Sequence, residues 1–138
     1  MTLDQISAIY GARKVDVDEP TVLIRINKLY RHTMTPAELY EATRGYWVVG
    51  SSREKAKLAM AVYARVVREV YEIQAWFPAG STFTTRAEAA DTEFLHPDRW
   101  EFVGRVADEA VRKKYLFRSV AHYFPKASQN PILYVNVK

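Results

Sequence analysis

Hydrophobic and polar positions alternate in several short segments of the chain, and this pattern predicts strands. Val22–Ile26 and Trp100–Val106 alternate as half-buried strands do, while Tyr46–Val49 and Ile132–Val137 are short and rich in aromatic and β-branched residues. Residues 78–99 are mostly polar and have little to bury, so we expect a long loop there. The pattern therefore predicts short strands separated by turns and one long connection.

Two segments carry the signals of a helix start. Thr35–Glu38 reads as a capping box with proline at the first helical position, and this predicts a helix that ends at Gly45. Asp108 is placed to cap a second short helix over Glu109–Tyr115. Both helices are short and lie between predicted strands.

The segment from Leu58 to Ile73 supports two interpretations. Its hydrophobic residues recur every three or four positions, which fits a helix, but most of them are β-branched or aromatic, which favours a strand. We predict a helix from a serine cap at Ser51 or Ser52 to about Met60, followed by a strand over residues 61–76. A strand of this length needs a bend or bulge, which we place near Arg68-Glu69.

Strands with short helices inserted between them predict an α+β fold with a small, curled, mostly antiparallel sheet or barrel. The chain has 138 residues, which suits one domain with one core. Residues 1–20, which end in an acidic stretch before Pro20, are expected to form a peripheral segment, and residues 21–138 the domain.

Composition narrows the class of protein without identifying it. Hydrophobic residues make up 49% and charged residues 26%, so the chain should fold. A net charge of +4 permits a polyanionic partner. The absence of cysteine excludes disulfides, thiolate nucleophiles and cysteine zinc sites. The N-terminus lacks the pattern of a signal peptide and no apolar run would span a bilayer, so we expect a cytoplasmic protein with no membrane partner.

The sequence predicts no catalytic residue, no metal site and no cofactor. The three histidines, His32, His96 and His122, have no second ligand at useful spacing in the same element. Residues 50–53, Gly-Ser-Ser-Arg, read either as a turn with a serine cap or as a phosphate cradle, and they lack the P-loop spacing. No Gly-x-Ser-x-Gly elbow occurs. A small hydrolase or nuclease stays an alternative.

Two aromatic pairs lie beside basic residues, and this combination suits the binding of a base and its phosphate. Since neighbouring strand residues point to opposite faces, Tyr46-Trp47 and Trp76-Phe77 should each place one ring in the core and one outside. Trp47 and Trp76 are the stacking candidates, and packing of all four rings in the core is the alternative. The candidates for phosphate contact are Arg44, Arg53 and Arg68, with Lys55 and Arg65 nearby.

A second candidate is the basic, polar loop before the last strand. Lys126 can meet a phosphate, and the amides of Gln129 and Asn130 can pair with base edges. Equally, Asn130-Pro131 can simply form the turn into the strand. These residues favour a non-catalytic nucleic-acid-binding domain, for DNA or RNA, that recognises a flipped or modified base. A protein-interaction or regulatory module is the first alternative.

Four segments, Leu23–Asn27, Glu38–Gly45, Arg53–Ala56 and Val67–Tyr71, together resemble an uncharacterised prokaryotic module. This module is associated with the C-terminal part of some GIY-YIG-type nuclease proteins. The likeness covers most of the chain and implies no biochemical role. The Gly-Ile-Tyr and Tyr-Ile-Gly pair of the nuclease is missing, so the resemblance does not imply nuclease activity.

The expected strand order and the placement of Trp47, Trp76 and Trp100 are also similar to PUA-like domains, including the EVE, YTH and ASCH groups. Those domains are small barrels with inserted helices, and many of them bind RNA or modified bases. The likeness therefore implies a PUA-like fold and a nucleic-acid partner, at the level of architecture.

Overall fold

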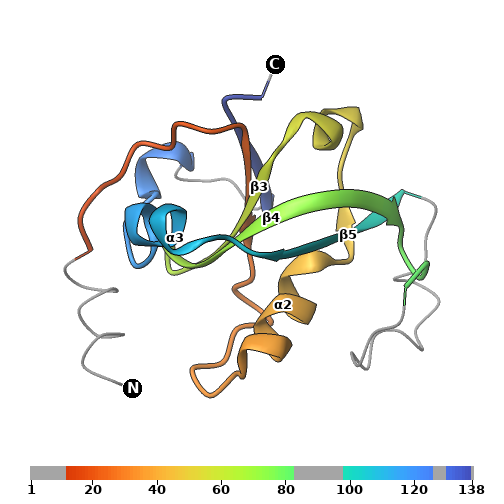
Figure 1. Cartoon of the computed structure of the whole chain (residues 1–138), viewed down its shortest axis with the longest axis horizontal. Helices are drawn as coiled ribbons and strands as arrows, with labels where there is room; N and C mark the ends of the chain where they lie inside the picture. Colours follow the sequence, from red (N-terminus) through yellow and green to blue (C-terminus); the bar gives the residue numbers. More distant parts are fainter. Residues whose placement is uncertain (1–11, 83–97, 126–129, 138) are drawn as a thin grey trace.

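The structure is a computed structural model that describes residues 12–82, 98–125 and 130–137 (Figure 1). Most of the loop predicted over residues 78–99, together with Lys126 and Gln129, lies outside the described residues. The described elements are β1 (Thr21–Arg25), α2 (Pro36–Arg44), β2 (Trp47–Val48), the 3-10 helix η1 (Ser51–Lys55), β3 (Leu58–Tyr63), β4 (Val66–Pro78), β5 (Arg99–Val106), α3 (Glu109–Tyr115), the 3-10 helix η4 (Ala121–Tyr123) and β6 (Ile132–Val135).

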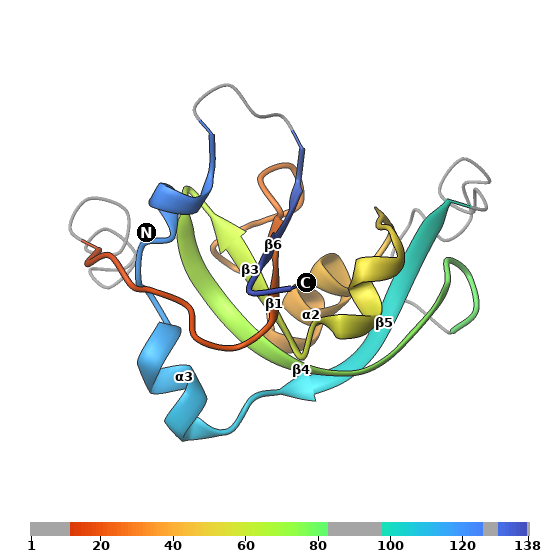
Figure 2. The ribbon, with the colours of Figure 1, turned by 90° about the horizontal axis from the view of Figure 1, so that it is seen from above.

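In the described part of the chain, the strands form a single six-stranded mixed sheet in the order β2-β5-β4-β3-β1-β6. β1 and β3 are parallel and every other neighbouring pair is antiparallel. The sheet curls until it is nearly closed, with α2 and η1 inside the curl and α3 outside it (Figure 2). The prediction of an α+β fold with a small curled sheet and inserted short helices is thus confirmed.

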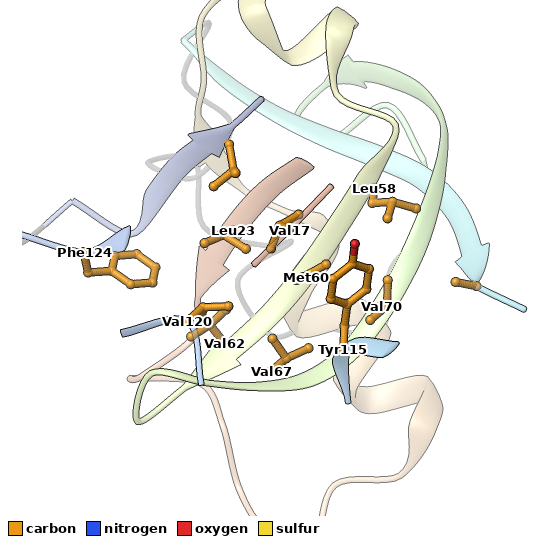
Figure 3. Packing of buried hydrophobic residues seen from close by; sticks show 12 residues of the cluster. Val17, Leu23, Leu58, Met60, Val62, Val67, Val70, Tyr115, Val120 and Phe124 are labelled. Atoms are coloured by element: carbon orange, nitrogen blue, oxygen red, sulfur yellow. The ribbon is translucent and has the colours of Figure 1, made fainter. Parts of the chain in front are cut away.

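The core lies on both faces of the sheet, because β1 and β3 are buried on both sides. Leu23 and Met60 pack on the outer face with Tyr115 of α3, as Figure 3 shows. Val22 packs inside the curl with Phe102 and the other members of a second cluster. Strands covered on both faces carry unbroken hydrophobic runs, since neither face needs polar residues.

The N-terminal segment takes part in this core. Val17 is buried in the outer cluster, and the backbone N–H of Val15 donates to the carbonyl of Ser119 at 3.0 Å. Residues 1–20 are predicted to be a peripheral segment, but residues 12–20 pack against the domain. The acidic stretch is held by Lys114, which forms ion pairs with Asp18 and Glu19.

The segment after Ser51 folds differently from the prediction. The helix ends at Lys55 rather than near Met60, and Leu58–Tyr63 forms the central strand β3. The single strand predicted over residues 61–76 is therefore two strands joined by a hairpin. The prediction is wrong because β3 is buried on both faces, so its hydrophobic run carries no polar alternation to distinguish strand from helix.

The hairpin turn between β3 and β4 consists of Ala64 and Arg65, which have φ angles of 52° and 62°. Two-residue turns with positive φ at both positions normally carry glycine or asparagine, so the sequence gives no turn signal here. The bulge predicted near Arg68 is confirmed. The β3–β4 register passes from Ala61 opposite Glu69 to Val62 opposite Val67, which leaves Arg68 as the extra residue.

The caps predicted at Thr35 and Asp108 are confirmed, whereas the serine cap predicted at Ser51 or Ser52 is wrong, because the N-cap of η1 is Gly50 and no side chain caps it. Thr35 caps α2 in a complete capping box with Glu38, in which each side chain accepts a hydrogen bond from the other residue's backbone N–H at 3.1 Å. The backbone hydrogen bond from Thr35 lowers the pKa of Glu38. Asp108 caps α3 by accepting from the N–H of Val111 at 3.1 Å.

Gly104 allows β5 to pass close to a second bulge of β4, at Gln74, where the β4–β5 register shifts. A Cβ on Gly104 would lie 2.1 Å from the carbonyl oxygen of Glu72. The strand can therefore carry no side chain at this position. Among the helices of the described residues, none combines the length and apolar character needed to cross a membrane.

Candidate functional site

Arg44 lies in the interior, where carboxylates surround its guanidinium. Its Nε donates to Glu41 at 3.0 Å, and its Nη1 donates to Glu101 at 2.8 Å. Glu101 is fully buried and also accepts from the N–H groups of Gly80 and Ser81. Burial opposes the charge of Arg44, but the hydrogen bonds to Glu41 and Glu101 outweigh it and raise the pKa of Arg44. The phosphate contact predicted for Arg44 is therefore corrected: the guanidinium holds the turn after β4.

The two aromatic pairs alternate as predicted. Tyr46 and Trp76 are buried, while Phe77 is 39% exposed and Trp47 is partly buried. The ring of Trp76 packs edge-on against Phe102 at 5.3 Å between centroids. The stacking role predicted for Trp76 is corrected, because its indole is used in the core, and Tyr46 likewise presents no ring to a ligand.

Trp47 and Arg53 come together at one end of the sheet through a third residue, Trp100. Trp47 is paired with Trp100 across β2 and β5, and the guanidinium of Arg53 lies 3.5 Å from the centroid of the Trp100 ring. Arg53 also donates to the carbonyl of Gly50 at 2.9 Å and forms an ion pair with Glu54 at 3.4 Å. The contacts of Arg53 are thus largely made within the fold, and it covers a face of Trp100 that a base would need.

The opposite end of the sheet brings together a different set of residues around Arg68. The rings of Tyr30 and Tyr63 stack with centroids 4.5 Å apart, and His32 meets both rings edge-on at 5.3 and 6.0 Å. The Arg68 guanidinium carbon lies 5.3 Å from the Tyr30 centroid and 5.4 Å from that of Tyr63, within the range of a cation–π contact. These nearly equal distances place the guanidinium beside the stacked pair.

Arg68 is 4% exposed and forms no ion pair with a carboxylate of the described residues. Its Nε and Nη2 make long contacts to the carbonyl of Tyr63, at 3.4 and 3.3 Å. Its Nη1 is covered and has no hydrogen-bond partner within the described part of the chain. Burial lowers the pKa of Arg68, although a guanidinium stays charged at neutral pH. Arg68 is thus a buried cation that has no counter-ion among the residues that the structure describes.

This end of the sheet is basic because the segments that meet there carry arginine and lysine but no acidic residue. The carboxyl ends of β1 and β3 lie side by side, with Arg25 opposite Val62, and β6 begins beside them, where Pro131 accepts from the N–H of Arg25 at 2.8 Å. Figure 2 shows these segments on one side of the molecule. Residues 21–35 and 58–68 contain no aspartate or glutamate, and their cations are Arg25, Lys28, Arg31, Arg65 and Arg68.

We call this region, formed by residues 25–32, 63–68 and 130–131, the basic end. It includes two of the predicted site residues, Arg68 and Asn130. The side chain of Asn130 accepts from the N–H of Ile132 at 3.0 Å, which fits its predicted role in the turn into β6. Its other predicted role, the reading of a base edge, stays a prediction. Arg31 at the basic end forms an ion pair with Glu38, whereas Lys28 and Arg65 are exposed.

The turn at Ala64 and Arg65 adds backbone strain at the basic end. A residue with a Cβ in the left-handed region costs about 1–2 kcal/mol, and here two such residues follow one another. Strained backbone of this kind persists where the surroundings enforce it and often marks a functional site. The strained turn presents the exposed side chain of Arg65 beside Tyr63.

Tyr30 and Tyr63 were not predicted as site residues. They are 33 positions apart in the sequence and meet only because β1 and β3 pair in parallel, which the sequence does not reveal. A local signal was nevertheless present, since each tyrosine follows a hydrophobic strand and is followed closely by arginine, Arg31 in one case and Arg65 in the other.

The described histidines serve within the fold. His32 packs against the tyrosine pair, and His122 lies 3.2 Å from a carboxylate oxygen of Asp16, while His96 is outside the described residues. Within the described ranges, no group of three or more histidine, aspartate or glutamate side chains is arranged to hold a metal ion. Comparison with protein-family models, curated proteins and solved structures gave no match for this chain.

Proposed function

We propose that this protein is a non-catalytic nucleic-acid-binding module that holds a single strand at the basic end. The observation that carries the proposal is Arg68, a buried guanidinium beside the Tyr30–Tyr63 pair without a carboxylate partner among the described residues. Buried charges are normally paired within the fold, so an unpaired one indicates that its partner is a ligand. A phosphate group is the anion that best matches a guanidinium.

The neighbouring residues suit the other parts of a nucleotide. Partly exposed aromatic rings such as Tyr30 and Tyr63 offer surfaces on which bases stack, at about 1–3 kcal/mol per base. Exposed cations such as Lys28 and Arg65 attract the phosphate backbone over longer distances. Stacking on a side chain needs an unpaired base, so the proposal favours a single strand or a base flipped out of a duplex, including a modified one.

We also propose that the fold is PUA-like. The support is architectural: a small mixed sheet that is nearly closed, with short helices inserted between its strands. Fold alone does not assign a function, so the nucleic-acid proposal rests on the basic end and would stand under another fold name.

The test is a fluorescence-anisotropy titration with single-stranded and duplex oligonucleotides, with and without a modified base, at two salt concentrations. The informative variant is Ala64→Asn/Arg65→Gly. It supplies the preferred residues of this turn, so it should fold at least as well as the natural chain while losing one exposed cation. We expect weaker binding of single strands and a salt dependence reduced by about one phosphate contact.

The matched control is Arg105→Gln. Arg105 is an exposed arginine in β5, paired with Glu72 and away from the basic end, so this variant removes the same charge elsewhere. We expect its binding to equal that of the natural chain. Equal weakening in both variants would mean that net charge, rather than the basic end, drives the association. Absence of binding to any oligonucleotide at low salt would refute the proposal and favour a protein-interaction module.

A further inference from the structure

The donors of Arg68 are largely unused. A guanidinium carries five N–H donors in a planar fork. In the described part of the chain, two nitrogens of Arg68 contact the carbonyl of Tyr63, both beyond the usual distance of a strong hydrogen bond, and its side chain also interacts by hydrogen bonding with that of Tyr30. The third nitrogen, Nη1, has no partner among the described residues.

Arg44 shows how the same fold satisfies a buried arginine. It is 5% exposed, close to the value for Arg68. Each of its three guanidinium nitrogens donates to an acceptor, and two of these acceptors are the carboxylates of Glu41 and Glu101. Arg68 lies equally deep with no such partner. The difference points to an acceptor that comes from outside the chain.

The burial of Arg68 restricts the shape of that acceptor. Arg68 is 4% exposed and lies beside the rings of Tyr30 and Tyr63, so a narrow anionic group suits it better than an internal phosphodiester, which carries a sugar on both sides. A terminal phosphate has three oxygens beyond its last bond and carries a charge of about −1.5 to −2 at neutral pH. It can enter end-on, with its own nucleoside remaining outside.

We propose that Arg68 receives the terminal phosphate of the bound strand, while the terminal base stacks on one ring of the tyrosine pair. This inference rests on the nucleic-acid-binding function proposed above. Because Nη1 is covered, binding includes a rotation of the Tyr30 ring away from Tyr63. Tyr30 lies in the connection between β1 and α2, and its partly buried ring packs against the core cluster inside the curl, so such a rotation gives up part of that packing.

The test compares four ligands by anisotropy or competition: one single strand with a 5′-phosphate, the same strand with a 3′-phosphate, the same strand with hydroxyl ends, and a free nucleoside monophosphate. The natural chain is compared with Arg68→Met, which keeps the volume and removes the charge, and with Arg68→Lys. We expect one terminal phosphate to tighten binding at least about tenfold, the value of one charge-assisted hydrogen bond to a buried donor. Arg68→Met should abolish that preference, and Arg68→Lys should retain part of it.

The outcomes separate this inference from the function on which it rests. Equal binding of phosphorylated and hydroxyl-ended strands, or a preference that persists in Arg68→Met, overturns the terminal-phosphate assignment and leaves nucleic-acid binding standing. If the free monophosphate binds as tightly as the phosphorylated strand, the ligand is a free nucleotide, and the proposal that the site holds a strand is wrong. Absence of binding to every ligand overturns both proposals. If Arg68→Met fails to fold, the comparison of strand ends and the Arg68→Lys variant decide the question.

Discussion

Replacement of each buried arginine by methionine should shift stability in opposite directions. Arg44 and Arg68 are 5% and 4% exposed, and methionine fills a similar volume without charge. At Arg44 the change leaves Glu101 fully buried without its guanidinium, and breaking a buried pair in this way costs about 3–5 kcal/mol. At Arg68 no carboxylate of the described residues loses a partner, so the change removes a buried charge that is unpaired within that part of the chain.

The change in the free energy of unfolding that we expect for Arg68→Met follows from the contacts of the Arg68 side chain. The substitution loses two cation–π contacts, worth about 0.5–1 kcal/mol each, and two long hydrogen bonds to the carbonyl of Tyr63. It also relieves the desolvation of a buried ion, which amounts to several kcal/mol even after relaxation. We expect a net gain of about 1–2 kcal/mol, or a Tm increase of about 4 °C for each kcal/mol in a chain of this size.

Thermal and urea unfolding followed by circular dichroism measure both variants against the natural chain. The expected result is a large loss of stability for Arg44→Met and a small gain for Arg68→Met, together with weaker ligand binding in the second variant. A loss above about 2 kcal/mol in Arg68→Met would refute the reasoning, because it would mean that the guanidinium contributes to folding as Arg44 does. A stabilised variant that binds poorly is the expected signature of a residue kept for function.

Three further predictions follow from single contacts. Gly104→Ala should prevent normal folding, because its Cβ would lie 2.1 Å from the carbonyl oxygen of Glu72, and a lost unfolding transition or insoluble expression would show this. Thr35→Ala should lower the free energy of unfolding by about 0.5–2 kcal/mol, measured by urea titration, because α2 loses its cap. Glu38→Gln should destabilise the protein at pH 7, and this difference in stability should disappear on acidification. The pKa of Glu38 is lowered in the folded state, so its carboxylate contributes stability above the ordinary pKa of 4.5, and this contribution is lost as the pH falls through the pKa of the folded state.

The sequence predicted well where local chemistry decides the structure. The capping box at Thr35, the cap at Asp108 and the fold class are all confirmed, because caps and amphipathic strands depend on neighbours within a few positions. The bulge at Arg68 was also predicted, from the length of the β-rich run alone. The hairpin at Ala64 and Arg65 was not, because its turn uses residues that normally avoid positive φ.

The candidate site depended on pairings that the sequence does not specify. The parallel contact of β1 with β3 joins Tyr30 to Tyr63, and no local pattern fixes which distant strands become neighbours. The sequence pattern of aromatic residues next to arginine pointed to Trp76, and in the structure the tyrosines show the same combination. Trp76 turned out to pack in the core, while the tyrosine pair lies beside the one predicted arginine, Arg68, that has no carboxylate partner among the described residues.

The distribution of acidic residues distinguishes the two buried arginines more clearly than their burial does. Arg44 follows Glu41 by three positions on the same helix, and Glu101 reaches it from β5, so its charge is compensated when the chain folds. Arg68 lies at the end of a stretch, residues 58–68, that contains no acidic residue, and the facing residues 21–35 contain none either. Glu69, the residue that follows Arg68, pairs with Arg112 of α3, so the described contacts of Arg68 are with two aromatic rings and a carbonyl. A buried charge of this kind should weaken the fold, and this is the reason that Arg68→Met is expected to gain stability.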